Sequence, residues 1–185
     1  MSDGAQPTLS TRRLLLRPFT LDDAREVQRL AGAREVADTT LTIPHPYPDG
    51  AAEAWIATHA ADWEARRMLH FAITPADVGE GVERGVVGAI SLAFASGHPR
   101  AELGYWIGVP YWGRGIATEA ARAVVRHGFE QLGLERIFAL HFVRNAASGR
   151  VLVKAGMQLE GRLRRHVRKG DAFEDADLYA VLRPR

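Results

Sequence analysis

The stretch GYWIGVPYWGRGIATEA, which occupies residues 104–120, predicts three successive elements of structure. Residues 101–109 have the apolar and aromatic content of a strand, and they run directly into a turn that contains Gly113 and Gly115. After the turn, apolar residues recur at helical spacing, at Ala120, Ala121, Val124, Val125, Phe129 and Leu132. We therefore expect a strand, a glycine turn and an amphipathic helix to follow one another here.

The turn at 113–118 has the properties of an anion-binding site. Its small residues let a ligand approach the backbone, and the first turn of the following helix has N–H groups without helical partners. The helix dipole favours an anion such as a pyrophosphate at this end. The alternative is a tight turn that only joins strand to helix. Two nucleotide motifs fit poorly, because the Gly-Lys of NTPase phosphate loops is absent and Thr118 replaces the third glycine of the dinucleotide fingerprint.

Strands and helices alternate on both sides of this unit. The expected strands outside it lie near 11–18, 70–74, 85–95, 136–142, 157–167 and 172–182. The expected helices outside it lie near 20–31, 51–67 and 146–155. A proline-rich loop covers 43–50, and the strands at 70–74 and 85–95 form a hairpin through a polar connection. This order predicts an α/β (α+β) fold with a mixed, mainly antiparallel central sheet flanked by helices.

The composition is that of one globular domain. The chain has 185 residues, of which 46% are hydrophobic and 25% charged, and this predicts a single domain over 1–185 with a flexible N-terminus at 1–10. No apolar run approaches the roughly 20 residues of a membrane helix, and residues 1–7 lack the apolar core of a secretory peptide. We expect a cytoplasmic protein with no membrane partner.

Charge and residue types exclude several classes of function. Without cysteine, the chain has no disulfide, no thiolate metal site and no acyl-cysteine intermediate. The seven histidines show no metal-ligand spacing, so we expect no metal. The net charge of +2 does not describe a nucleic-acid binder, and no nucleic-acid partner is expected. The basic residues at 162–169 fit a solvated hairpin, and the alternative is a docking surface for an acidic partner.

Segment 104–120 resembles the acetyl-CoA-binding motif of the GNAT superfamily of N-acetyltransferases. It is most similar to the RimJ/RimL-type branch of ribosomal-protein N-terminal acetyltransferases. The resemblance covers nearly the whole chain: TRRLLLRPF at 11–19 with Asp22 and Asp23 matches the opening of this branch, 145–157 its coenzyme helix and 175–179 its final strand. It implies a GNAT-like acyl-CoA N-acyltransferase fold.

The resemblance also implies which residues bind acetyl-CoA. The strand at 101–109 would splay from its neighbour, and the pantetheine arm would lie in the gap like an added strand. Main-chain donors of the turn would hold the pyrophosphate, and an amide near Ile107 would face the thioester oxygen. Asn145 would hydrogen-bond the arm, cap its helix, or do both. The coenzyme residues implied in this way are Tyr105, Trp106, Ile107, Gly113, Arg114, Gly115, Ile116, Ala117, Thr118, Asn145 and Ser148.

Ser148 and Glu102 are the candidates for proton transfer. Many members of the superfamily carry a tyrosine seven residues after the asparagine to protonate the departing thiolate, but this chain has Leu152 there. The role then passes to Ser148, which the resemblance places near the sulfur. Glu102 would take a proton from the substrate ammonium, directly or through water, because only a neutral amine attacks a thioester. The alternative for Glu102 is a solvated strand residue.

The function implied by the resemblance is transfer of an acetyl group from acetyl-CoA to a primary amine, above all a protein N-terminal α-amine, by direct attack in a ternary complex. Two alternatives stay open: a same-fold enzyme acting on a polyamine or aminoglycoside, and a non-catalytic module that binds acetyl-CoA. The protein would be a monomer or homodimer. Tyr47 and its loop could line an acceptor cleft, whereas Trp55 and Trp63 are interpreted as packing residues.

Overall fold

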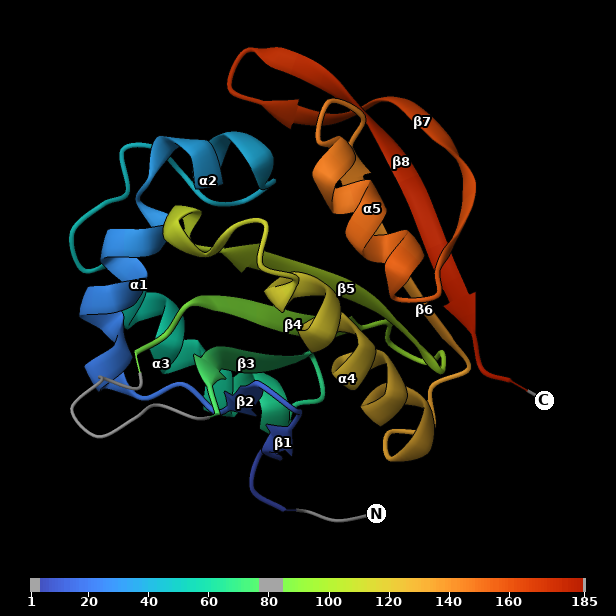
Figure 1. The fold of residues 1–185 in the computed structure, drawn as a ribbon, viewed down its shortest axis with the longest axis horizontal. Helices are drawn as coiled ribbons and strands as arrows, with labels where there is room; N and C mark the ends of the chain where they lie inside the picture. The colour runs from blue at the N-terminus through green and yellow to red at the C-terminus, as the bar shows by residue number, and fades with distance from the viewer. Residues whose placement is uncertain (1–3, 77–84, 185) are drawn as a thin grey trace.

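The computed structural model describes residues 4–76 and 85–184, which form one sheet between two layers of helices (Figure 1). Within these residues the sheet has eight strands in the order β1-β2-β3-β4-β5-β6-β8-β7. Every neighbouring pair is antiparallel except β5 and β6, which are parallel. The expectation of a mixed, mainly antiparallel sheet flanked by helices is therefore confirmed.

The described elements follow the expected order closely. Up to the fourth strand they are β1 (Leu9–Ser10), β2 (Leu14–Arg17), the 3-10 helix η1 (Leu21–Asp23), α1 (Ala24–Ala31), α2 (Arg34–Thr39), α3 (Ala51–Glu64), β3 (Met68–Pro75) and β4 (Gly88–Phe94). They continue with β5 (Arg100–Ile107), η2 (Val109–Tyr111), α4 (Ile116–Glu130), β6 (Arg136–Phe142), α5 (Ala146–Lys154), β7 (Gln158–Lys169) and β8 (Ala172–Leu182).

Three details differ from the sequence-based expectations. Helix α2 was not expected. Leu9 and Ser10 pair with β2, so the flexible N-terminus expected at 1–10 does not include them. The helix expected from 20 starts with the 3-10 turn η1 and becomes α-helical at Ala24. The strands β3 and β4 pair as expected, while most of their connection, at 77–84, lies outside the described residues.

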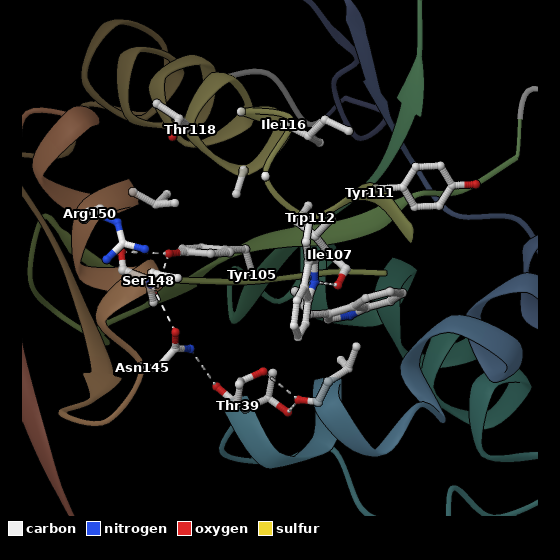
Figure 2. A pocket seen from close by; sticks show the side chains of 18 of the residues that line it. Thr39, Tyr105, Ile107, Tyr111, Trp112, Ile116, Thr118, Asn145, Ser148 and Arg150 are labelled. Carbon is white, nitrogen blue, oxygen red and sulfur yellow. Dashed lines mark hydrogen bonds between the residues drawn. The ribbon is translucent and has the colours of Figure 1, made fainter. Parts of the chain in front are cut away.

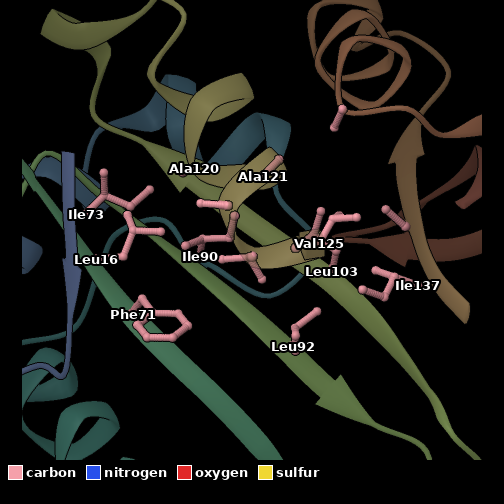
Figure 3. Packing of buried hydrophobic residues seen from close by; sticks show 14 of the residues in the cluster. Leu16, Phe71, Ile73, Ile90, Leu92, Leu103, Ala120, Ala121, Val125 and Ile137 are labelled. Carbon is pink, nitrogen blue, oxygen red and sulfur yellow. The ribbon is translucent and has the colours of Figure 1, made fainter. Parts of the chain in front are cut away.

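Both faces of the sheet are buried, because the side chains of its central strands point alternately to the two helical layers. On β3 the side chains of Leu69, Phe71 and Ile73 point to the face covered by α4, whereas Ala72 points to the face covered by α1 and α3. Small residues on α4, such as Ala120 and Ala121, let this helix lie close to the strands (Figure 3). Helix α4 therefore has a fixed position over the sheet, and so does the glycine turn from which it starts.

A partly buried ion pair joins β2 to η1, the turn that leads into α1. Arg17 donates two hydrogen bonds of 2.7 Å to the carboxylate of Asp23, and the main-chain N–H of Thr20 donates a third of 2.8 Å. Burial alone would raise the pKa of Asp23, but these donors hold it below its usual range. The bond from Thr20 also belongs to a capping box at the start of η1, in which Thr20 is the N-cap.

The sheet opens between β5 and β6. Their parallel pairing covers only 100–102 on β5 and 136–138 on β6, although β5 continues to Ile107 and β6 to Phe142. Beyond Glu102, the edge of β5 that faces β6 has backbone donors and acceptors without a strand partner. The splay implied by the resemblance is thus present in the fold.

Candidate coenzyme and acceptor site

A first cavity, of ≈ 350 Å³, lies at the opening between β5 and β6 (Figure 2). Its walls come from the end of β5, the turn before α4 and one face of α5, with the end of α2 at its mouth. The predicted coenzyme residues that line it are Tyr105, Trp106, Ile107, Gly113, Gly115, Ile116, Ala117, Thr118, Asn145 and Ser148. The structure therefore brings together every predicted coenzyme residue except Arg114.

Arg114 does not line this cavity. Its exposed guanidinium lies over the ring of Tyr111, with the guanidinium carbon 5.7 Å from the ring centroid, and its carbonyl accepts a hydrogen bond of 3.1 Å from Arg13. The contact of Arg114 with the coenzyme therefore stays a prediction.

The turn before α4 presents unpaired backbone donors to the first cavity. Gly113 and Gly115 have φ values of 73° and 76°, in the left-handed region that glycine adopts without strain. The N–H of Glu119 bonds to the carbonyl of Gly115, so the N–H groups of residues 116–118 precede the first intrahelical bond. The three residues that carry these N–H groups line the cavity.

The carboxylate of Glu119, in the same helical turn, would repel an anion if it were unpaired. It accepts a hydrogen bond of 2.7 Å from the Thr11 hydroxyl and forms an ion pair of 2.6 Å with Arg13. Burial would raise the pKa of Glu119, but the bonds from Thr11 and Arg13 lower it. Glu119 thus ties the start of α4 to the segment before β2, and its charge is offset there.

Helix α5 forms the opposite wall with a polar cap and two cations. The side-chain oxygen of Asn145 accepts a hydrogen bond of 3.2 Å from the N–H of Ser148, so Asn145 caps the helix, and its contact with a ligand stays a prediction. Arg150 and Lys154 line the cavity one helical turn apart (Arg150 in Figure 2). The sequence analysis missed these two cations, although residues 147, 150, 151 and 154 have the spacing of one helix face.

Ser148 and Tyr105 form a hydroxyl pair inside the first cavity (Figure 2). The two oxygen atoms are 2.7 Å apart, and the Tyr105 hydroxyl is also 3.3 Å from the main-chain oxygen of Ser148. Burial raises the pKa of Tyr105 to about 12, while the bond to Ser148 acts in the opposite direction. The phenol is therefore protonated near neutral pH. From the sequence, the backbone of Tyr105 was expected to matter more than its side chain, and a role for the hydroxyl was not predicted.

Leu152 and Trp112 are two further residues whose positions bear on the site. Leu152, which stands where many superfamily members have a tyrosine, is fully buried in the main core and does not line the cavity. Trp112, which the sequence analysis did not assign, lines the cavity and donates a hydrogen bond of 2.6 Å from its indole N–H to the carbonyl of Ile107. Its position directly before the glycine turn could have identified Trp112 as a candidate site residue from the sequence.

A second cavity, of ≈ 560 Å³, lies on the face of the sheet covered by α1 and α3. It is lined by Tyr47, Trp55 and the half-buried Glu102, among others, so Tyr47 does line a cleft. Burial raises the pKa of Glu102, and the charge of His166 opposes this. The residues that line both cavities are Thr39, Thr40, Tyr105, Trp106 and Ser148. Glu102 and Ser148, the two candidates for proton transfer, therefore both border the second cavity.

Comparison with known proteins decides the family. Residues 13–158 match the family model described as "Acetyltransferase (GNAT) domain", which is well over half of the chain. The chain belongs to the GNAT family. It is thus an acetyl-CoA-dependent N-acetyltransferase, and acetyl-CoA is its co-substrate.

Several GNAT relatives are similar over much of this chain. The uncharacterized N-acetyltransferase YoaA of Bacillus subtilis is 34% identical, with 97% of this chain and 98% of YoaA covered. The ribosomal-protein-serine acetyltransferase of Escherichia coli is 35% identical over 43% of this chain and 45% of its own length. Among solved structures, Mycobacterium smegmatis RimJ in complex with CoA-disulfide has a TM-score of 0.79 and 26% identity, with 91% of this chain and 81% of RimJ covered.

The described part of the chain has neither a membrane-spanning helix nor a cluster of metal ligands. No helix within residues 4–76 and 85–184 is long and apolar enough to cross a membrane. Within the same ranges, no group of three or more His, Asp or Glu side chains could hold a metal ion.

Three basic side chains of the hairpin β7–β8 have partners within the protein. Arg162 pairs with Asp177 at 2.8 Å, Arg168 lies 3.7 Å from Asp171, and Lys169 donates to a main-chain carbonyl of the loop before α3. These contacts favour the interpretation of this segment as a structural hairpin.

Proposed function

We propose that the first cavity of this GNAT enzyme holds acetyl-CoA, that the second holds a primary amine, and that the acetyl group passes between them where the cavities meet. The observation that carries this proposal is the shared border: Tyr105, Trp106 and Ser148 line both spaces. A thioester placed at this border would be open to attack from the second cavity. This geometry suits a ternary complex in which the amine attacks directly.

The first cavity suits the charged and polar parts of the coenzyme. Its free N–H groups at 116–118 would bind the pyrophosphate at the positive end of α4, and Arg150 and Lys154 would offset the phosphate charge from the other side. The pantetheine arm would pair with the free edge of β5. An N–H near Ile107 would then face the thioester oxygen and stabilise the oxyanion of the tetrahedral intermediate.

The proton transfers follow from the positions of Glu102 and Ser148. The substrate ammonium loses one proton to the carboxylate of Glu102, directly or through water, and the neutral nitrogen forms a bond to the thioester carbon. The carbon–sulfur bond of the intermediate then breaks, and the nitrogen loses its second proton to solvent. The departing thiolate takes a proton from the hydroxyl of Ser148. The Ser148 oxygen takes a proton in turn from the hydroxyl of Tyr105, to which it is hydrogen-bonded, and solvent returns a proton to Tyr105.

A protein N-terminal α-amine is the acceptor we propose. One similar protein supports a protein acceptor by name, namely the ribosomal-protein-serine acetyltransferase of E. coli. A panel that pairs acetyl-CoA with N-terminal peptides, polyamines and aminoglycosides, with thiol release as the readout, would test this proposal. Peptide acetylation is expected. Preference for a polyamine or aminoglycoside would contradict it, and tight coenzyme binding without turnover, or salt-sensitive RNA binding, would favour a binding module.

Glu102→Gln is expected to lower turnover by about 10²-fold at neutral and mildly acidic pH, as long as the pH stays above the raised pKa of Glu102, with nearly unchanged acetyl-CoA affinity. Because burial raises the pKa of Glu102, the wild-type rate should fall as the pH drops through that raised pKa, where the carboxylate becomes protonated. The deficit of the variant should shrink at alkaline pH, since an alkyl amine with a pKa of about 10 then deprotonates without help.

The pH profiles of kcat for the wild type and the variant check this prediction. Glu130→Gln, at the end of α4 and outside both cavities, is the matched control and should behave like the wild type. A Glu102→Gln profile identical to that of the wild type would leave Glu102 as an ordinary strand residue.

A further inference from the structure

The second cavity has a lining that selects among amines. We propose that the acceptor presents its primary amine on an uncharged, apolar body of about the size of an aromatic ring. This inference rests on the proposed function, because it takes the second cavity as the acceptor site. The same chemistry occurs in an arylalkylamine and in a peptide that begins with a large apolar residue.

The wall of the second cavity opposite the sheet is aromatic and held in place. Trp55 on α3 lines the cavity and packs edge-on against Phe19, with ring centroids 5.1 Å apart, and against His59, at 4.4 Å. Tyr47 and Trp106 line the cavity as well and pack against the same small core as Trp55. Rigid aromatic faces of this kind gain free energy by covering an apolar group and offer little to a polar one.

The charges of the second cavity match a single cation. Among the described residues that line it, Glu102 is the only carboxylate, and none is a lysine or arginine. His70 also lines it, but burial lowers the pKa of His70 despite Asp62 at 3.7 Å, so its imidazole is neutral near pH 7. His141, the other histidine of the lining, is buried, with its Nδ1 2.8 Å from the carbonyl of Phe142. One ammonium group therefore finds a partner, and a second would have none.

A cation beside the lining of the second cavity works against polyamines as well. The ammonium group of Lys169, at the tip of the β7–β8 hairpin, donates a hydrogen bond of 2.8 Å to the carbonyl of Ile43, and Ile43 lines the second cavity. A long polycation that reached this loop would meet the like charge of Lys169, and it would find a single carboxylate among the described residues of the lining. Spermidine and aminoglycosides are therefore poor matches for this cavity.

The second cavity is large enough for an acceptor with a side chain bigger than a methyl group. Its ≈ 560 Å³ lies within the range of about 300–1,000 Å³ found for small-molecule sites. An acceptor with a serine or alanine side chain leaves the Trp55 wall uncovered, whereas a phenyl ring can cover it. Covering the wall should raise kcat/KM about ten- to a hundredfold, as expected for burial of a large apolar side chain.

The test compares kcat/KM of the wild-type enzyme with saturating acetyl-CoA on 2-phenylethylamine, two peptides that differ only in a first residue of Phe or Ser, and spermidine. We expect 2-phenylethylamine or the Phe peptide to exceed both the Ser peptide and spermidine by at least about tenfold. The ratio of kcat/KM on 2-phenylethylamine to kcat/KM on the Phe peptide tells whether a small amine or a peptide N-terminus is the better acceptor. The inference is overturned if the Ser peptide or spermidine equals or exceeds them.

Two substitutions in α3 test whether the preference for an aromatic acceptor comes from the Trp55 wall of the second cavity. Trp55→Ala should lower kcat/KM on the preferred aromatic acceptor at least about tenfold, mainly through KM, and leave the Ser peptide within about twofold. Trp63→Ala is the matched control, because Trp63 lies on the same helix and outside the second cavity. Trp55→Leu and a measured acetyl-CoA affinity guard against misfolding of the alanine variant. An equal loss on all acceptors in a folded Trp55 variant also overturns the inference.

The failure of this inference and that of the proposed function give different results. If acetyl-CoA binds and no amine is acetylated, amine transfer itself is wrong. If amines are acetylated with spermidine or the Ser peptide preferred, amine transfer stands and only the apolar acceptor is wrong.

Discussion

Replacing Ser148 by alanine is expected to lower turnover by about 10²- to 10⁴-fold with little change in acetyl-CoA affinity, which is the usual value of general-acid assistance. The reason is that the usual position of the donor is occupied by Leu152, whose hydrocarbon side chain has no proton to give. The Ser148 hydroxyl lies on the border of both cavities, 2.7 Å from the Tyr105 hydroxyl. Single-turnover rates at saturating acetyl-CoA measure this effect, and Ser96→Ala, in an exposed turn, is the control.

Tyr105→Phe tests whether the two hydroxyls act as a unit. If Tyr105 supplies the proton that frees the Ser148 hydroxyl, its loss should slow turnover too, and the double variant should be hardly slower than Ser148→Ala alone. Fully additive losses would show that the hydroxyls act independently.

Two results would remove Ser148 from its role as general acid. A loss of only a few fold would make it a positioning residue, because a thiolate with a pKa of about 8 to 9 can take its proton from water after it leaves. Loss of coenzyme binding in a folded Ser148→Ala protein, with turnover spared at saturation, would make the hydroxyl part of the binding site instead.

Gly115→Val is expected to weaken acetyl-CoA binding by at least about tenfold, or 1.4 kcal/mol, in a protein that still folds. Gly115 lines the first cavity and precedes α4 with a φ of 76°, a conformation that a β-branched residue avoids. The new side chain would either obstruct the approach of the pyrophosphate or turn the N–H groups of 116–118 away from it. Calorimetric titration of the purified variant with acetyl-CoA gives the affinity.

A second glycine separates the effect on binding from backbone strain. Gly97 has a φ of 72° in the turn between β4 and β5, outside both cavities. Gly97→Val therefore introduces comparable strain, and it should lower stability while leaving acetyl-CoA affinity unchanged. Unchanged affinity in a folded Gly115→Val protein would show that the turn does not hold the coenzyme.

Most of the fold could be predicted from local patterns. The unit β5–turn–α4 was expected because strand residues, a glycine turn and helical spacing follow one another in one continuous stretch. Helix α2 was not predicted because only two of its six residues, Val36 and Ala37, are buried, and two residues are too few to show a helical period. The splay of β5 from β6 has no local signal and came from the family resemblance alone.

The candidate site was predictable where its residues are adjacent in the chain. The turn residues and the strand before them were assigned from one segment, and all but Arg114 line the first cavity. The pairing of Tyr105 with Ser148 joins residues that are 43 positions apart, and only tertiary packing brings them together. Trp55 was assigned to packing alone, but it both packs and lines the second cavity, a distinction that depends on the exposed fraction of its ring.

The central claim, that acetyl-CoA lies in the first cavity with its thioester at the border of the second, is tested most directly by a crystal structure of the protein with coenzyme A. We expect the pyrophosphate within hydrogen-bond distance of the N–H groups of 116–118, the pantetheine arm along the free edge of β5, and the sulfur beside the hydroxyl of Ser148. Coenzyme A bound outside the opening between β5 and β6, or with its sulfur away from Ser148 and the second cavity, would contradict the account.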